Sequence, residues 1–206
     1  MNVSYLKKNK KGFSLVELVV GTAILSVIGL TVAMLMTSGT NMYRRVYRRS
    51  SVFYKSQVST AQLQEALTDC EFPIAMTDDS MLLGSVEQSG TEKVKKIYVY
   101  YFNGPEGDDT GSGEIDLRID TVEDGAVNTD GEVTPFCKHC SSIKYTPSFS
   151  SDGTAYAVKI SMTVTRYGVS YSRNDVISLR NRPEIIKLDS LDEAENALAE
   201  RLEAIE

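Results

Sequence analysis

Residues 11–36 read KGFSLVELVVGTAILSVIGLTVAMLM, an apolar stretch that begins directly after a basic segment. The apolar part, Phe13–Met36, has 24 residues and would reach about 36 Å as a helix, enough to cross a bilayer core with some tilt. Its one charged residue is Glu17, and no charge occurs between Leu18 and Tyr43. The stretch therefore predicts a membrane-crossing helix, and a plain signal anchor is the simplest interpretation.

The residues on either side of this stretch bear on its orientation and processing. Four lysines and no acidic residue precede it, namely Lys7, Lys8, Lys10 and Lys11. Lysines before an apolar run place the N-terminus in the cytoplasm. Five cations follow the run and weaken that argument, namely Arg44, Arg45, Arg48, Arg49 and Lys55. An ordinary secretory signal peptide would have a shorter apolar region and a small-residue cleavage site, and no such site stands out.

Two details point to something narrower than an anchor. A carboxylate in an apolar span costs about 2.5–3.5 kcal/mol at mid-membrane and less near the edge, so Glu17 predicts a partner. Gly12 marks the junction between the basic leader and the apolar run.

The segment Lys11-Gly12-Phe13-Ser14-Leu15-Val16-Glu17 resembles the class III signal of type IV pilins and pseudopilins. The resemblance implies that a prepilin peptidase cuts between Gly12 and Phe13 on the cytoplasmic side and methylates Phe13 as the new first residue. It also implies that Glu17, then the fifth residue, pairs with the N-terminal amine of a neighbouring subunit. Such pairing partly offsets the desolvation of both ions and fixes axial register.

The chain stays compatible with a helix from Thr37 to about Leu67, without a proline and with Gly39 as its one glycine. At 100° per residue, an arc of about 140° holds seven mostly apolar residues. They are Tyr43, Val46, Tyr47, Phe53, Tyr54, Val58 and Ala61. We expect this arc to cover a sheet, with the five cations opposite. Those cations fit a solvated face, a contact with lipid head groups or acidic neighbours, or, with least support, DNA.

The remainder predicts a β-rich head. Pro73 ends the helix, residues 75–92 are expected to form a polar loop, and residues 93–103 read as a strand with two alternating faces. On a second strand Ile115, Leu117 and Ile119 alternate with Asp116, Arg118 and Asp120, which indicates one buried face and one solvated face. Residues 156–167 and 171–179 complete four main strands, joined by loops at 104–113 and 124–132.

The C-terminal residues predict a separate element. Ser190-Leu-Asp-Glu193 is a candidate capping box, and an apolar stripe follows it on an otherwise acidic helix. The stripe consists of Leu191, Ala194, Leu198, Leu202 and Ile205. This helix is expected to dock on the head or on a partner, or to fray, and its acids could meet the arginine face of a neighbouring stem.

The expected fold class is α+β, with a long N-terminal helix packed on an antiparallel sheet and a short amphipathic C-terminal helix. The expected parts are a leader over 1–12, a transmembrane and assembly helix over 13–36, and its amphipathic continuation over 37–70. A globular head over 71–183 and an acidic helix over 184–206 follow.

The composition weighs against several classes of function. Among 206 residues, 22 are basic and 28 acidic, and removal of the four leader lysines changes the formal net charge from −6 to −10, which weighs against nucleic-acid binding. One histidine leaves little material for a His-based triad or metal site, and no P-loop or dinucleotide motif occurs. We therefore expect neither catalysis nor a cofactor.

The cluster Cys137-Lys-His-Cys140 is the one site-like motif. A disulfide, either between Cys137 and Cys140 or between one of them and Cys70, is the leading interpretation, with free thiols and a metal site as alternatives. The acidic runs at Asp108-Asp109 and at Asp120, Glu123 and Asp124 lack EF-hand spacing, so solvated loops are favoured over a Ca²⁺ site.

The end of the head, Asn174–Pro183, is similar to that of minor pilins of the PilW type and of J-type pseudopilins. The length agrees, since the 194 residues left after cleavage are generous for a major subunit. The resemblance implies a minor subunit, single-pass in the cytoplasmic membrane with an extracytoplasmic head, and later part of a surface filament. Implied partners are prepilin peptidase, other pilin or pseudopilin subunits, an inner-membrane assembly platform and the lipid bilayer. Such filaments serve adhesion, motility, DNA uptake or secretion. The alternative is a signal-anchored extracytoplasmic binding or thiol-redox module that uses Cys137 and Cys140.

Overall fold

The computed structural model describes residues 12, 14–89, 92–104 and 113–205. Helix α1 (Leu15–Thr68) comes first and helix α2 (Leu191–Glu203) last. The strands between them are β1 (Ile74–Met76), β2 (Ser80–Ser89), β3 (Glu92–Asn103), β4 (Gly113–Glu123), β5 (Ala126–Asn128), β6 (Val133–Phe149), β7 (Ala155–Arg166), β8 (Val169–Ser178) and β9 (Ile185–Lys187). The chain divides into two compact units between Tyr47 and Arg48.

The first unit consists, in its described part, of the N-terminal portion of α1. Its apolar side chains are exposed; Leu25, for example, is 74% and Leu35 72% accessible. Hydroxyl groups along the apolar run donate to carbonyls of the preceding turn, from Thr22 to Val19 (3.0 Å), from Ser26 to Thr22 (2.8 Å) and from Thr31 to Ile28 (2.8 Å). Because these hydroxyl groups are bonded within the helix, the helix surface can lie against lipid or against apolar protein without an unsatisfied polar group.

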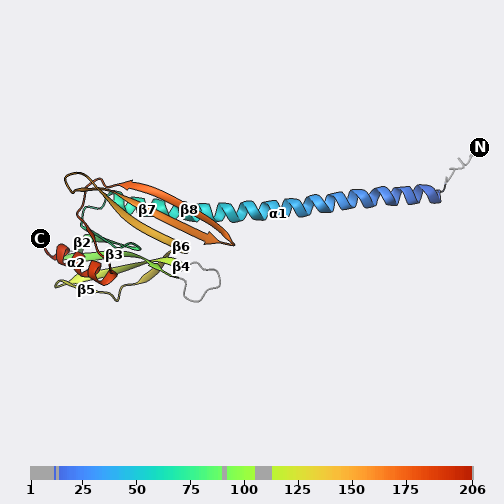
Figure 1. The fold of residues 1–206 in the computed structure, drawn as a ribbon. Helices are drawn as coiled ribbons and strands as arrows, with labels where there is room; N and C mark the ends of the chain where they lie inside the picture. The colour runs from blue at the N-terminus through green and yellow to red at the C-terminus, as the bar shows by residue number, and fades with distance from the viewer. Residues whose placement is uncertain (1–11, 13, 90–91, 105–112, 206) are drawn as a thin grey trace, which may run out of the picture. The chain divides into compact units, whose positions relative to one another are not determined.

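The second unit is a head built on one sheet (Figure 1). Within the described residues the sheet has nine strands in the order β8-β7-β6-β4-β3-β2-β1-β9, with β5 paired to β4. All neighbours are antiparallel except β1 and β9, which run parallel. This confirms the α+β class and the antiparallel sheet.

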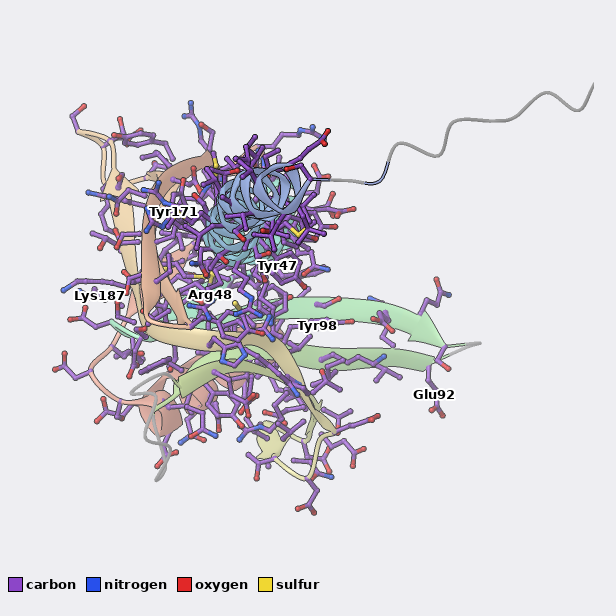
Figure 2. All side chains as sticks on the ribbon, turned by 90° about the vertical axis from the view of Figure 1, so that its right-hand side faces the viewer. Tyr47, Arg48, Glu92, Tyr98, Tyr171 and Lys187 are labelled. Carbon is purple, nitrogen blue, oxygen red and sulfur yellow. The ribbon has the colours of Figure 1, made fainter. Side chains whose placement is uncertain are left out.

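The sheet curves around the C-terminal part of α1, with β6–β8 forming one arm and β2–β4 the other (Figure 2). Val52, Leu63 and Leu67 of α1 are fully buried in the core that fills this curve. Helix α2 lies on the opposite face, where Ala194, Leu198 and Leu202 form a second core with Leu82 and Val99.

Some strands bury side chains on both faces, because one face packs on the α1 core and the other on the α2 core. Tyr98 and Tyr100 of β3 face α1, whereas Ile97 and Val99 face α2, as the predicted alternation required. On β2, a Cβ added at Gly84 would lie 3.0 Å from Leu202 Cδ2 and 3.1 Å from the Pro73 carbonyl oxygen. A side chain here would need Leu202 and the Pro73 carbonyl to move by a few tenths of an ångström, so the close packing around β2 favours a glycine at this position.

The packing face of α1 differs from the expected arc. Of the arc residues in the head, Tyr54 is 65% and Val58 37% exposed, whereas the ring of Phe53 lies edge-on to that of Tyr171 on β8, with 5.2 Å between centroids. The arc therefore covers the sheet only in part. The buried face mixes large apolar and small polar residues. They are Val52, Leu63 and Leu67, with Ser56, Ser59 and Thr60 between them. Thr60 donates to the Ser56 carbonyl at 2.8 Å, and this internal bond allows a hydroxyl to be buried where helix and sheet approach closely.

The loops expected at 75–92 and 124–132 contain strands, and the strand over 133–149 was not predicted. Residues 75–92 contain most of β1 and all of β2, which Thr77 and Ser80 connect in a tight turn (Thr77 N–H to Ser80 O, 2.9 Å). Residues 133–149 form β6, which accommodates Pro135 and Pro147 near shifts of register. The four predicted strands and the β7–β8 turn at Tyr167-Gly168 are confirmed.

Candidate functional site

The N-terminal end of α1 contains the residues singled out from the motif. Glu17 lies in the first turn of the helix, where a negative charge is favoured by the helix dipole, and its side chain is exposed. The Leu18 N–H donates to the Ser14 carbonyl at 3.1 Å, so the helical bonding reaches back to Ser14. Gly12 is exposed, and Phe13 lies outside the described residues, as do the leader lysines.

The apolar run that follows Glu17 meets the requirements of a membrane span. Helix α1 is long and apolar enough to cross a bilayer, and none of its most apolar 18-residue window is buried by the rest of the chain. An isolated run of exposed Leu, Ile and Val needs a lipid or protein environment to cover it. The first unit is therefore long and apolar enough to anchor the chain in a membrane.

Cys137 and Cys140 lie on β6 and are both buried on the α1 side of the sheet. Residues three apart on a regular strand face opposite sides. Here His139, with a φ of 66°, forms a bulge, so that Cys137 pairs with Ile115 and Cys140 with Gly113. Three steps along β6 therefore match two along β4, which brings both thiols to the same face.

None of the three cysteines, all within the described residues, forms a disulfide in this structure. Their partners on β4, Ile115 and Gly113, are two strand steps apart, which corresponds to about 6.6 Å between Cα atoms. That is near the upper end of the usual disulfide range of about 4.4–6.8 Å. The disulfide stays a prediction.

The protonation of these thiols opposes redox exchange. Burial raises the pKa of Cys140 to about 12, and the nearby Cys137 sulfur adds to the rise. Burial also raises the pKa of Cys137, although the Ser59 hydroxyl and Lys55 partly counter it. Reactive cysteines are exposed and have lowered pKa values, because the thiolate is the nucleophile. The alternative of a thiol-redox module therefore finds no support in this geometry.

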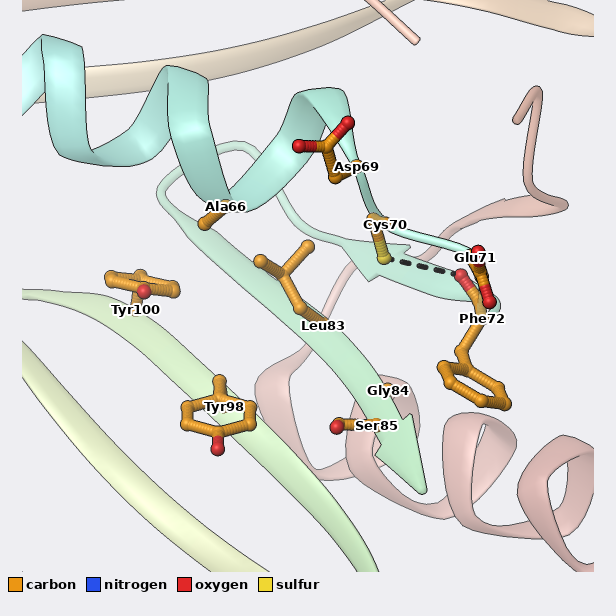
Figure 3. A pocket seen from close by; sticks show the side chains of 10 residues that line it. All are labelled: Ala66, Asp69, Cys70, Glu71, Phe72, Leu83, Gly84, Ser85, Tyr98 and Tyr100. Carbon is orange, nitrogen blue, oxygen red and sulfur yellow. Dashed lines mark hydrogen bonds between the residues drawn. The ribbon is translucent and has the colours of Figure 1, made fainter. Parts of the chain in front are cut away.

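Cys70 lies just after α1 at a cavity of about 340 Å³ (Figure 3). Its thiol donates to the Phe72 carbonyl at 3.4 Å, and burial raises its pKa. Leu83 and the rings of Tyr98 and Tyr100 line the same cavity.

A buried ion cluster that the sequence did not predict joins α2 to the sheet. Arg118 Nε donates to both carboxylate oxygens of Asp120 at 2.9 Å, and its Nη2 donates to Glu195. The Asp120 side chain is fully buried and that of Glu195 is 7% exposed. Asp116, Arg118 and Asp120 therefore do not face solvent as expected, because α2 covers their side of β4.

One of the two acidic runs weighed for Ca²⁺ falls outside the described residues, and the other contains a carboxylate that already has a cationic partner. Asp108 and Asp109 lie outside the described residues. Asp120 is bound to Arg118, and Glu123 and Asp124 lie at the β4–β5 turn. Asp120 therefore already has a cationic partner.

The ion cluster predicts how stability changes with pH. Burial raises the pKa of Glu195, and the nearby Asp120 adds to this, whereas Arg118 lowers it. The folded state then binds the Glu195 proton more tightly than the unfolded chain, so this group makes folding more favourable as pH falls through its raised pKa towards the ordinary range of a glutamate. Glu195→Gln should remove that contribution. Urea unfolding of both proteins at several pH values measures it, and parallel pH profiles for the two would contradict it.

A comparison with protein families matches residues 7–33 to the prokaryotic N-terminal methylation motif. No curated protein and no solved structure matched the chain. The matched segment contains the Gly12–Phe13 junction, Glu17 and most of the apolar run. Together, the motif and the exposed apolar helix that contains much of it indicate a type IV pilin-like protein, a membrane-anchored substrate of prepilin peptidase.

Proposed function

We propose that this chain is a minor subunit of a type IV pilus or pseudopilus, which enters or primes the filament after processing. The methylation motif followed by an apolar helix carries this proposal. A helix whose apolar surface its own head leaves exposed can exchange lipid for the stems of neighbouring subunits, because both environments are apolar.

In this proposal each part of the N-terminal segment has one task. Prepilin peptidase cuts after Gly12 and methylates Phe13, and residues 13–36 pack against sister stems. Glu17 neutralises the new N-terminal ammonium of an adjacent subunit and so sets the axial register. The N-terminus starts in the cytoplasm and the head outside it, where it contacts other subunits; an inner-membrane assembly platform drives extraction from the bilayer.

The minor rather than major role rests on the similarity of residues 174–183 to PilW-type minor pilins and J-type pseudopilins. The 194 residues left after removal of residues 1–12 are generous for a major subunit. The head acts through contacts with other subunits, without a cofactor or a reaction of its own.

Processing gives the first test. Mass spectrometry of the protein from native membranes should find that residues 1–12 are absent and that Phe13 carries one methyl group. Gly12→Leu should leave the leader attached, because a large side chain at the cut site blocks the peptidase, whereas Lys8→Ala should be processed normally. An intact Met1 terminus on the wild-type protein would instead select a signal anchor.

A further inference from the structure

The head carries a group of cations that face the α1 side of the sheet. This cationic face consists of Arg48 and Lys55 of α1, Lys138 of β6 and Arg166 of β7. Two of its members flank one ring: the guanidinium carbon of Arg166 lies 4.5 Å, and that of Arg48 5.8 Å, from the centroid of Tyr167. Within the described part of the chain, none of the four forms an ion pair with a carboxylate.

These cations repel one another. Burial lowers the pKa of Lys55, and the charges of Arg166 and Lys138 lower it further. Lys55 and Lys138 also line a cavity of about 210 Å³ beside Tyr54, whose side chain is 65% exposed. A set of like charges around an exposed aromatic ring suits an anionic partner, which would relieve the repulsion and cover the ring.

The complementary surface lies on the other face of the same sheet. Helix α2 is held there by its buried apolar stripe, and it exposes Asp192, Glu193 and Glu200. Within the described residues these three acids form no ion pair. Since the sheet lies between the cationic face and α2, the two surfaces of one molecule do not meet.

We propose that the cationic face docks the acidic side of α2 from a second copy of this chain. The two patches lie on opposite faces of the sheet, so two copies cannot make both contacts with each other at once; the contact is heterologous and continues into a filament or a ring instead of closing a dimer. It rests on the proposed filament function and adds to it that copies of the chain lie next to one another in the assembly. The fixed position of α2 on its own head presents the acids without a cost of ordering a free segment.

Charge reversal tests this contact in the full-length protein in its own membranes. A zero-length carbodiimide cross-linker joins lysines to carboxylates, and in the wild type it should link Lys138 or Lys55 of one copy to α2 of another. Lys138→Glu with Arg166→Glu should reduce these products at least about tenfold. Asp192→Lys, Glu193→Lys and Glu200→Lys together should do the same, while Lys159→Glu, a change at another exposed lysine, should not.

Co-expression of the two reversed proteins gives the decisive result. The reversed face of one variant should accept the reversed helix of the other, and the unaltered face and helix that the two variants also carry should pair with each other. Cross-links between these two variants should therefore return to at least half of the wild-type level. Tyrosine circular dichroism of each variant checks that the head is folded. Failure of the pair to restore cross-linking, or cross-links of Lys138 to a different protein only, would overturn the inference.

Two further measurements separate this inference from the proposed function. If the wild-type protein is unprocessed and absent from filaments, the proposed function is wrong. If it is processed and present in filaments and both reversed variants enter them at the wild-type level, only the docking contact is wrong. Loss of binding of the cation-reversed variant to anionic phosphatidylglycerol vesicles, with unchanged cross-linking between copies, would assign the face to lipid and overturn the contact.

Discussion

Glu17→Ala is expected to remove the protein from sheared filaments, with a loss of more than about tenfold, while membrane insertion and cleavage after Gly12 continue. The substitution makes the apolar helix more apolar, so insertion becomes easier. The N-terminal ammonium of the adjacent subunit, in contrast, would enter an apolar assembly without a counter-charge, and an unpaired buried ion is strongly disfavoured. Immunoblots of the sheared and membrane fractions, together with the N-terminal mass, measure both effects.

Two variants on the same turn sharpen this test. Glu17→Gln keeps the size and hydrogen bonding of the side chain but not its charge, so it should be excluded from filaments as Glu17→Ala is. Val16→Ala, a neutral change at an exposed neighbour, should assemble normally. Recovery of Glu17→Ala in sheared filaments at the wild-type level would show that the carboxylate does not set the register.

Local signals made part of the fold predictable. The uncharged run and the absence of proline predicted a helix to about Leu67, and α1 ends at Thr68. Alternation predicted both faces of β3, because each face packs against a helix. The capping box also predicted the start of α2, where the Glu193 N–H donates to the Ser190 hydroxyl at 3.3 Å.

Long-range packing limited the other predictions. The face of α1 that packs on the sheet contains Ser56, Ser59 and Thr60, so hydropathy pointed instead to the neighbouring, more apolar arc. In that arc Tyr54 remains exposed, and Phe53 contacts Tyr171 of β8. Pro135 and Pro147 argue against a central strand, yet bulges allow β6 to carry both. The polar side of β4 was expected in solvent because nothing in its own sequence indicates that α2 covers it.

The ion cluster of Arg118, Asp120 and Glu195 could in part have been predicted from the sequence. Glu195 follows Ala194 directly, on the edge of the predicted apolar stripe of α2, and it is buried there. A carboxylate at such a position needs a cation, and Arg118 is the cation on an acidic strand face. The CxxC motif did not predict that both thiols lie on one face of the sheet. That arrangement comes from the His139 bulge, which depends on the pairing of β6 with β4.

Arg118→Met is expected to lower the free energy of unfolding by about 3–5 kcal/mol, because it leaves the carboxylates of Asp120 and Glu195 buried without their cation. Methionine keeps much of the volume of the arginine stem, so the loss reports charge and not a cavity. Urea unfolding of the processed chain in detergent micelles, followed by tyrosine circular dichroism, measures the change. The unfolding signal should come from the head, since the cluster joins β4 to α2.

The loss of stability in Arg118→Met is expected to come from the two carboxylates left without a cation, and a second variant tests this. Arg118→Met combined with Asp120→Asn and Glu195→Gln removes all three charges while retaining similar side-chain volumes, so it should regain most of the lost stability. Lys96→Met, at an exposed pair with Glu87, should cost less than about 1 kcal/mol. If Arg118→Met were no more destabilising than Lys96→Met, the cluster would not hold α2 on the sheet, and the rigid presentation of its acids to a neighbouring copy would lose its basis.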